Sequence, residues 1–196
     1  MVAVSLRWQP LALGLAAALY CQSPALAQSP PLAERIVQCA GCHGEDGNSR
    51  MENIPSLAGQ PEFFLMNQLF LMREGVRQIE AMMPFVKDLK DDEMHALAAH
   101  YAKLEPRRGD EKVDTALAAR GEQLATQRRC GSCHKPDLGG DQQMPRLAKQ
   151  RSDYLTHALK GYRDSTRTGA DTLMSASVAG LPDADLAALA HFAASR

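Results

Sequence analysis

The sequence predicts an all-α protein built from two small domains in tandem. Apolar residues recur at helical spacing, as at Met94, Leu97 and Tyr101, and no stretch sustains the alternation typical of a β-strand. The second half of the chain also repeats the first at an offset of about 90 residues. Self-similarity of this kind marks two copies of one structural unit.

Four pairs of segments carry the repeat. They are "CAGCH" (39–43) with "CGSCH" (130–134), "PSLAGQ" (55–60) with "PRLAKQ" (145–150), "MREGVR" (72–77) with "YRDSTR" (162–167), and "LKDDEMHALAAHY" (89–101) with "LPDADLAALAHF" (181–192). Between the copies, 104–113 is polar and contains Pro and Gly, as linkers do. We therefore expect an N-terminal domain over 28–106 and a C-terminal domain over 107–196.

Each unit is expected to contain a helix after its proline segment and another at its end. The first pair falls at 63–72 and 154–162. The last helix of the first unit is predicted over 91–104, where three acidic residues suit a first turn. In the second unit Pro182 and Asp183 mark the start of the equivalent helix.

Residues 1–27 are typical of a cleavable export signal. Arg7 supplies the positive charge, "LALGLAAALY" the apolar stretch, and "ALAQ" a cleavage site after Ala27. An uncleaved anchor is the alternative, but the apolar stretch is short for a membrane span. The mature chain is thus expected to begin near Gln28, to lose Cys21 with the signal, and to work outside the cytoplasm.

Composition narrows the class of protein further. The chain has 196 residues and a net charge of −1, so no basic excess points to nucleic acid. Aromatic residues make up 5% of the chain, which leaves two small domains short of large core side chains. Domains of this size are marginal without a covalent or metal staple.

The four cysteines of the mature chain form two C-x-x-C-H motifs, Cys39–Cys42–His43 and Cys130–Cys133–His134. On a helix, positions i, i+3 and i+4 share one face, so two thiols can bond a haem while the adjacent imidazole reaches its iron. A structural zinc site would need a fourth ligand in each half. A thioredoxin-like motif would need a βαβ fold. Two motifs at matching places favour two covalently bound haem c groups, which would also complete the core.

The sixth iron ligand decides what such a haem does. Met82 precedes Leu89 by seven residues and Met174 precedes Leu181 by seven, which predicts methionine ligands on loops before the last helices. Met83, beside Pro84, is the competitor in the first half. The other histidines do not occupy equivalent places in the two copies.

Residues around the haem sites can also be suggested from the repeat. Pro55 and Pro145 lie 12 and 11 residues after their histidines, where a backbone carbonyl could accept the histidine Nδ1–H. Arg77 and Arg167 match across the repeat and are either partners of haem propionates or solvated surface residues.

With these residues in view, the chain resembles the class I dihaem cytochromes c, specifically the cytochrome c4 family. The resemblance rests on both C-x-x-C-H motifs, the "P-x-L-A-x-Q" segments and the "M-x(6)-L-x-D" approach to the last helix. It implies two tandem cytochrome c domains, each wrapped around a covalent haem c, with haem propionate edges facing across the domain interface. It further implies thioether bonds at Cys39, Cys42, Cys130 and Cys133, and axial pairs His43–Met82 and His134–Met174. One departure is that Gly121 in the second half has no glycine counterpart near Pro30 in the first.

The family resemblance also implies a function and its partners. Such proteins are not enzymes; they shuttle electrons in the bacterial periplasm between a respiratory donor and an acceptor, typically a terminal oxidase. No nucleic acid and no small-molecule substrate are expected as partners. The first alternative is the electron-accepting subunit of a periplasmic dehydrogenase, such as a sulfide-oxidising flavoprotein. The second is a haem peroxidase or ligand sensor, which would require an open sixth position.

Overall fold

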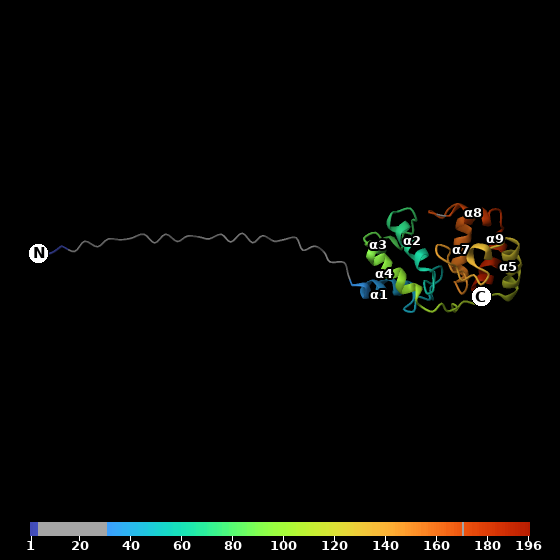
Figure 1. Cartoon of the computed structure of the whole chain (residues 1–196), viewed down its shortest axis with the longest axis horizontal. Helices are drawn as coiled ribbons and strands as arrows, with labels where there is room; N and C mark the ends of the chain where they lie inside the picture. Colours follow the sequence, from blue (N-terminus) through green and yellow to red (C-terminus); the bar gives the residue numbers. More distant parts are fainter. Residues whose placement is uncertain (4–30, 170) are drawn as a thin grey trace.

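The computed structural model describes residues 1–3, 31–169 and 171–196. Its helices form two lobes along the chain (Figure 1). The first lobe contains α1 (Leu32–His43), α2 (Glu62–Arg73), α3 (Met83–Val86) and α4 (Asp91–Ala102). The second contains α5 (Thr115–Gln127), α6 (Gly131–His134), α7 (Ser152–Arg163), α8 (Thr172–Val178) and α9 (Asp183–Ser195). In the described residues the only β-type pairing is an isolated bridge between Asp141 and Met144, so the all-α prediction is confirmed.

Each lobe has its own hydrophobic core. Leu65, Val86 and Leu97 belong to the first cluster, and Leu155, Val178 and Leu189 occupy the corresponding places in the second. None of these residues is shared between the clusters. Two separate cores are what a tandem repeat of one structural unit requires.

The same arginine contact links two helices in each domain, α2 with α4 and α7 with α9. Arg73, at the end of α2, donates from Nη1 to the Leu89 carbonyl (3.0 Å) and to Asp91 (2.6 Å) at the start of α4. Arg163, at the end of α7, does the same to the Leu181 carbonyl (2.9 Å) and to Asp183 (2.6 Å). One arginine therefore holds the start of the last helix in both domains.

The C-terminal domain closes where α5 crosses α9. A Cβ at Gly121 would lie 2.6 Å from the carbonyl carbon of Ala188 and 2.7 Å from the Phe192 Cβ, so only glycine fits at this crossing. In the first domain the position equivalent to Gly121 is Pro30, which lies outside the described residues, as do residues 4–27 of the predicted signal. There α1 instead meets α4 through an ion pair between Arg35 and Glu93 (3.1 Å).

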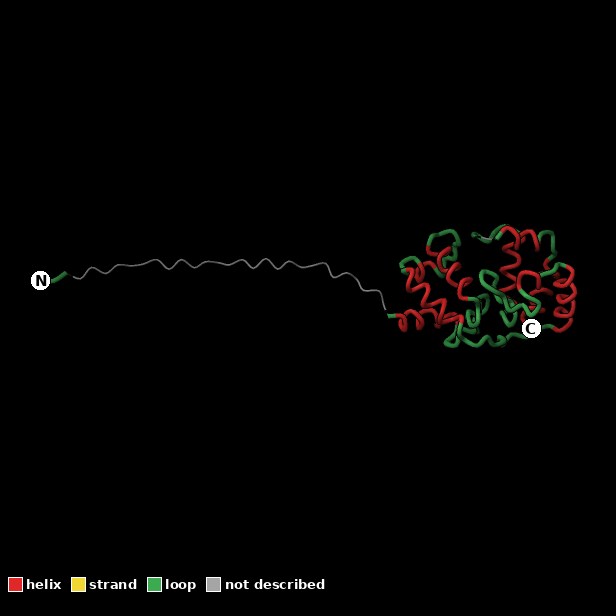
Figure 2. The backbone as a smooth tube through the Cα atoms, viewed as in Figure 1, coloured by secondary structure: helices red, strands yellow, loops and turns green. Residues whose placement is uncertain are grey.

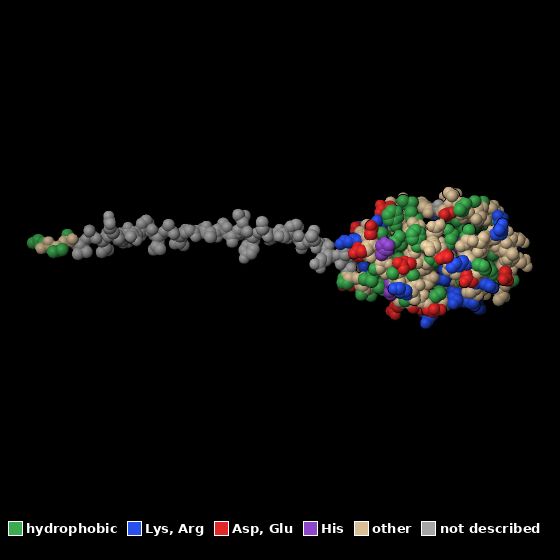
Figure 3. Space-filling view, in the orientation of Figure 1, with side chains coloured by type: hydrophobic (Ala, Val, Ile, Leu, Met, Phe, Trp, Pro, Cys, Tyr) green, Lys and Arg blue, Asp and Glu red, His purple; other side chains and the backbone are tan. Residues whose placement is uncertain are grey.

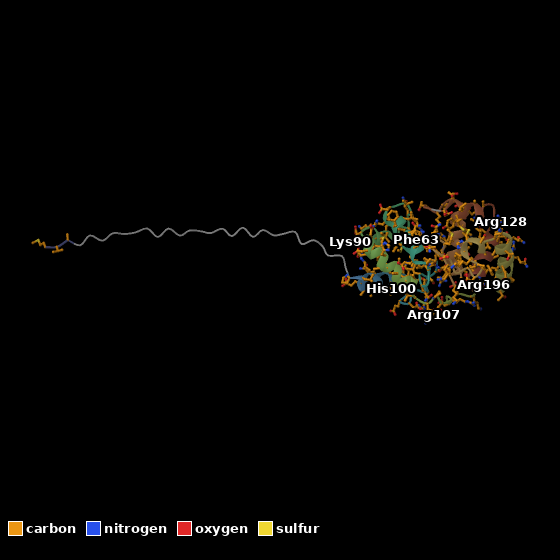
Figure 4. The ribbon with its side chains drawn as sticks, viewed as in Figure 1. Phe63, Lys90, His100, Arg107, Arg128 and Arg196 are labelled. Carbon is orange, nitrogen blue, oxygen red and sulfur yellow. The ribbon has the colours of Figure 1, made fainter. Side chains whose placement is uncertain are left out.

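The linker between the domains is held at both of its ends. Asn48 donates to the Glu105 carbonyl (3.1 Å) and accepts from the Arg107 backbone N–H (2.8 Å). Arg151 pairs with Asp110 and Glu111 (both 3.3 Å) from the second domain. Figure 4 shows Arg107 at the lower edge, where the linker passes between the lobes. The linker therefore follows the surface of both domains.

The two lobes meet mainly through loops. Figure 2 shows green loop segments between the two groups of red helices. These loops include 44–61 of the first domain and 135–151 of the second, which follow the two C-x-x-C-H motifs. A large part of the domain interface is thus built from the segments that also surround the histidines.

The helix predictions hold with small differences. The helices predicted over 63–72 and 154–162 are each slightly longer, and the one predicted over 91–104 ends at Ala102. Met174 was expected on a loop but lies inside α8, which Asp171 caps by accepting from the backbone N–H groups of Leu173 (2.8 Å) and Met174 (3.2 Å). That cap lets a short helix form ahead of the turn at Gly180. No described helix has the length and apolar character to cross a membrane.

Candidate haem sites

Both C-x-x-C-H motifs lie on helical turns. Cys39, Cys42 and His43 form the last turn of α1, while Cys130 precedes α6 and Cys133 and His134 belong to it. In each motif the first thiol is partly buried, the second is exposed, and neither forms a disulfide. The helical spacing places the two thiols and the imidazole of each motif on one face. Free thiols in this arrangement are what two thioether bonds to one haem require.

Both motif histidines are held in a single orientation. His43 is 6% exposed and its Nδ1 lies 2.8 Å from the Pro55 carbonyl oxygen; His134 is 8% exposed and its Nδ1 lies 3.0 Å from the Pro145 carbonyl oxygen. A carbonyl oxygen only accepts hydrogen bonds, so Nδ1 carries the proton and Nε2 keeps a free lone pair. The carbonyl partners predicted from the sequence are confirmed.

Burial favours the same protonation state. It lowers the pKa of both imidazoles below the ordinary histidine value, more than the bond to the proline carbonyl raises it. Each ring is therefore neutral near pH 7, with its metal-binding nitrogen available. That is the form in which histidine ligates iron.

The candidate methionine ligands lie beside the same cores as the cysteines. Met82 and Met83 are partly buried against the first cluster, which Cys39 also contacts. Met174 is partly buried against the second, together with Cys130. Met82 immediately precedes α3 and Met83 begins it. Because both side chains reach the first cluster, the fold alone leaves the choice between Met82 and Met83 open.

Two arginines from different domains gather around one tyrosine. Burial would raise the pKa of Tyr154, but the charges of Arg77 and Arg167 outweigh it and hold this pKa below its ordinary value. Arg77 is 7% exposed, and its Nε is buried without a hydrogen-bond partner. A buried guanidinium with an unused donor fits an anionic group bound nearby, such as a haem propionate. The alternative of a solvated surface residue is wrong for Arg77.

These features together match a haem better than a zinc ion. No group of three or more His, Cys, Asp or Glu side chains in the described ranges is arranged to hold a metal. Each half instead offers two thiols, one oriented imidazole and a thioether beside an apolar cluster. Those are the protein groups that a covalently attached, hexacoordinate haem uses.

Sequence reasoning did not single out two buried residues at the domain interface. Gln60 and Gln150 end the two repeated "P-x-L-A-x-Q" segments and are 4% and 3% exposed. Their recurrence at the same place in both copies was the available signal. Glutamine is mostly exposed in proteins, so a buried matched pair indicates a specific polar role.

Part of the surface of the first domain is apolar. Large apolar side chains that remain exposed there are Phe63, Phe70, Val76 and Phe85. Figure 3 shows hydrophobic side chains over the upper part of this lobe, and Figure 4 labels Phe63 on it. An exposed patch of this kind marks a surface for a ligand or a partner.

Comparison with known families divides the chain as the repeat does. The family described as "Cytochrome c" matches residues 118–195. The family described as "Cytochrome C oxidase, cbb3-type, subunit III" matches residues 31–100. Each copy of the repeat is therefore a cytochrome c domain.

Several relatives align with most of the chain. Cytochrome c4 from Pseudomonas aeruginosa is 32% identical over 165 residues, covering 79% of this chain and 81% of the relative. The thiosulfate dehydrogenase electron acceptor from Thiomonas intermedia is 32% identical over 198 residues, covering 95% and 90%. Both alignments extend over the two domains.

The fold of the chain is also similar to solved structures of these two kinds of protein. Reduced cytochrome c4 from Pseudomonas stutzeri superposes with a TM-score of 0.73 at 28% identity, covering 84% of this chain and 98% of that one. Thiosulfate dehydrogenase from Marichromatium purpuratum superposes with a TM-score of 0.71 at 30% identity, covering 81% of this chain and 36% of that one. The fold and the tandem arrangement are thus shared with both.

Proposed function

The chain belongs to the cytochrome c4 family, and from this premise we propose that it carries electrons between redox proteins through two His/Met-ligated haems. Its cofactors are two covalently bound haem c groups. In this proposal Cys39 and Cys42 attach the first haem, and Cys130 and Cys133 the second. The axial ligands are His43 with Met82, and His134 with Met174.

The orientation of the histidines carries this proposal. Each imidazole is buried, neutral, and fixed through Nδ1 to a proline carbonyl, at 2.8 Å for His43 and 3.0 Å for His134. A bound haem iron supplies one-electron chemistry, and a methionine opposite histidine raises its reduction potential. These carbonyl bonds would hold the two imidazoles in place in both oxidation states of a bound iron. Little then has to move when an electron arrives, which favours fast transfer.

Other residues of the chain prepare the surroundings. The apolar clusters around Cys39 and Cys130 exclude water from one side of each site. The buried guanidinium of Arg77 lies between the domains, where it would pair with an anionic propionate. Low polarity and a nearby cation both bear on the reduction potential.

The proposal includes a cellular location and redox partners for the protein. The signal predicted at 1–27 sends the chain to the periplasm, where cleavage after Ala27 releases it. There it meets a respiratory donor and an acceptor, either a membrane complex such as a terminal oxidase or a dehydrogenase. The apolar patch that contains Phe63 and Phe70 is a surface on which a partner can dock.

A second candidate function has its own support. Two relatives are named thiosulfate dehydrogenase electron acceptor, and one of them aligns with 95% of this chain. The chain would then take electrons from a periplasmic dehydrogenase as its subunit or dedicated partner. Thiosulfate-dependent reduction of the purified protein by a co-purifying dehydrogenase distinguishes this role from that of a general carrier.

Redox titration with absorption spectra tests the ligand assignment. We compare the native protein with Met82→Ala, Met174→Ala and Met83→Ala. The first two variants are each expected to lose one methionine-ligated, high-potential centre, whereas Met83→Ala keeps both. Loss of a centre in Met83→Ala instead would move the ligand to Met83. If neither Met82→Ala nor Met174→Ala changed the spectrum, the assignment would be overturned.

A further inference from the structure

The loops at the domain interface exchange glutamine side chains in a symmetric way. Gln150 accepts from the Ser56 backbone N–H (2.8 Å) and donates to the Ser56 carbonyl (2.8 Å). Gln60 accepts from the Arg146 backbone N–H (3.0 Å) and donates to the Arg146 carbonyl (2.9 Å). Ser56 and Arg146 occupy the same position in the two repeats. In each direction, the side-chain amide of one glutamine therefore forms two hydrogen bonds to the backbone of the equivalent residue in the other domain.

One of the two peptide groups to which Gln150 bonds also orients the histidine of the first domain. The Pro55 carbonyl and the Ser56 N–H belong to a single peptide unit. Its oxygen accepts the His43 Nδ1–H (2.8 Å) while its N–H donates to Gln150 (2.8 Å). A continuous series of hydrogen bonds thus runs from the C-terminal domain to the imidazole of the N-terminal domain.

The reciprocal series has the same members. The Pro145 carbonyl accepts the His134 Nδ1–H (3.0 Å), and the N–H of the same peptide unit, on Arg146, donates to Gln60 (3.0 Å). The hydrogen-bond pattern also fixes which atom of each glutamine amide is oxygen, because a backbone N–H cannot accept. The two reciprocal series of hydrogen bonds at the domain interface are therefore built alike.

Burial makes these bonds hard to replace. Gln60, Gln150, Ser56 and Arg146 are 4%, 3%, 1% and 4% exposed, so water has little access to their bonds. Removing a buried partner leaves the other group unsatisfied, at a typical cost of about 1–3 kcal/mol. Hydrogen bonds in series also polarise one another in a medium of low dielectric constant. An acceptor on the N–H therefore strengthens the carbonyl as an acceptor for the histidine.

We propose that Gln60 and Gln150 are positioning residues that tune, across the interface, the axial histidine of the opposite domain. The inference rests on the proposed function, in which His43 and His134 are iron ligands. A stronger hydrogen bond at Nδ1 makes the imidazole a better electron donor to the iron, which favours the oxidised state. Each domain therefore sets part of the reduction potential of its neighbour, and separation of the domains would change both potentials.

The test measures the potential of each haem separately in Gln150→Met and Gln60→Met. Methionine is similar in length but cannot form either bond. NMR-monitored redox titration of the intact dihaem protein follows the resonances of each axial methionine. In Gln150→Met the haem bound at His43 should become easier to reduce. Its equilibrium constant for reduction should rise two- to threefold, which raises its reduction potential by about 20–30 mV at 59 mV per tenfold. In Gln60→Met the same change should appear at the His134 haem.

The crossed pattern separates this role from a merely structural one. Gln127→Met, at the exposed end of α5, serves as the matched control and should shift neither potential. A shift confined to the domain that carries the substitution would overturn the inference, as would equal shifts or no shift in both haems.

A second substitution keeps the inference testable if the methionine variants fold poorly. Gln150→Glu keeps an acceptor for the Ser56 N–H and strengthens it, so the haem at His43 should become harder to reduce, and by more than the haem at His134. A change of the opposite sign at the His43 haem would contradict the inference. Failure of the proposed function would appear elsewhere, as absent His/Met spectra in the unsubstituted protein, and would remove this inference with it.

Discussion

Substitution of Gly121 by alanine should destabilise the C-terminal domain, because this glycine lets α5 cross α9. The added Cβ would meet the backbone of Ala188, with its carbonyl carbon 2.6 Å away, and the Phe192 Cβ at 2.7 Å. A backbone obstacle cannot rotate aside, so the helices must separate. Overpacking of this kind costs roughly 3 kcal/mol, at the upper end of its usual range, whereas alanine gains about 1 kcal/mol over glycine within a helix. The net loss is therefore about 2 kcal/mol.

Thermal unfolding of the holoprotein, followed by circular dichroism, measures this loss. For a domain of this size about 2 kcal/mol corresponds to a fall of roughly 8–16 °C in the transition of the C-terminal domain. Gly41→Ala is the matched control: this glycine is also helical, has no atom within 4 Å of an added Cβ, and corresponds to Ser132 in the second copy. The control should be unchanged or slightly more stable. If Gly121→Ala unfolded at the wild-type temperature, the close crossing of α5 and α9 would be refuted.

Three further predictions concern the linker, pH and the haem. Asn48→Ala removes two bonds to the linker, worth roughly 1–2 kcal/mol together, so limited trypsin cleavage at Arg107 should accelerate about tenfold; an unchanged rate would contradict the tether. Burial alone would raise the pKa of Asp153, but its bonds to Arg151 hold this pKa below 3.8. The stability that these bonds add is thus present above pH 3.8 and lost as pH falls through the lowered pKa. In Asp153→Asn the melting temperature should therefore depend less on pH over that interval. Replacement of all four motif cysteines by alanine should leave a largely unfolded chain by far-UV circular dichroism, whereas a cooperative transition would show that haem is not needed for folding.

Much of the fold follows from local patterns that the repeat doubles. The last helices were predictable because Asp91 and Asp183 begin stretches with helical apolar spacing in both copies. The carbonyl partners of the histidines were also predictable, since Pro55 and Pro145 keep a similar distance in sequence from the two motifs. A signal that occurs twice at the same place is less easily accidental than one that occurs once.

Features that depend on contacts between distant segments were not predictable. Met174 is a separate case: it was expected on a loop, and what starts a helix around it is local, the cap at Asp171 three residues earlier. The roles of Gln60 and Gln150 appear only when the two loops meet, about 90 residues apart in sequence. The burial of Arg77 likewise comes from the interface, because the first domain alone does not supply Tyr154.

An anaerobic reductive titration of the native protein, combined with haem analysis of its peptides, tests the central claim most directly. The account predicts two electrons per chain, two haem groups bound covalently at Cys39/Cys42 and Cys130/Cys133, and histidine–methionine spectra for both irons. The reduced protein should also bind carbon monoxide only slowly, because both sixth positions are filled. A single haem, haem released by acid extraction, or rapid carbon monoxide binding would contradict the account, and the last would favour a ligand-binding haem protein.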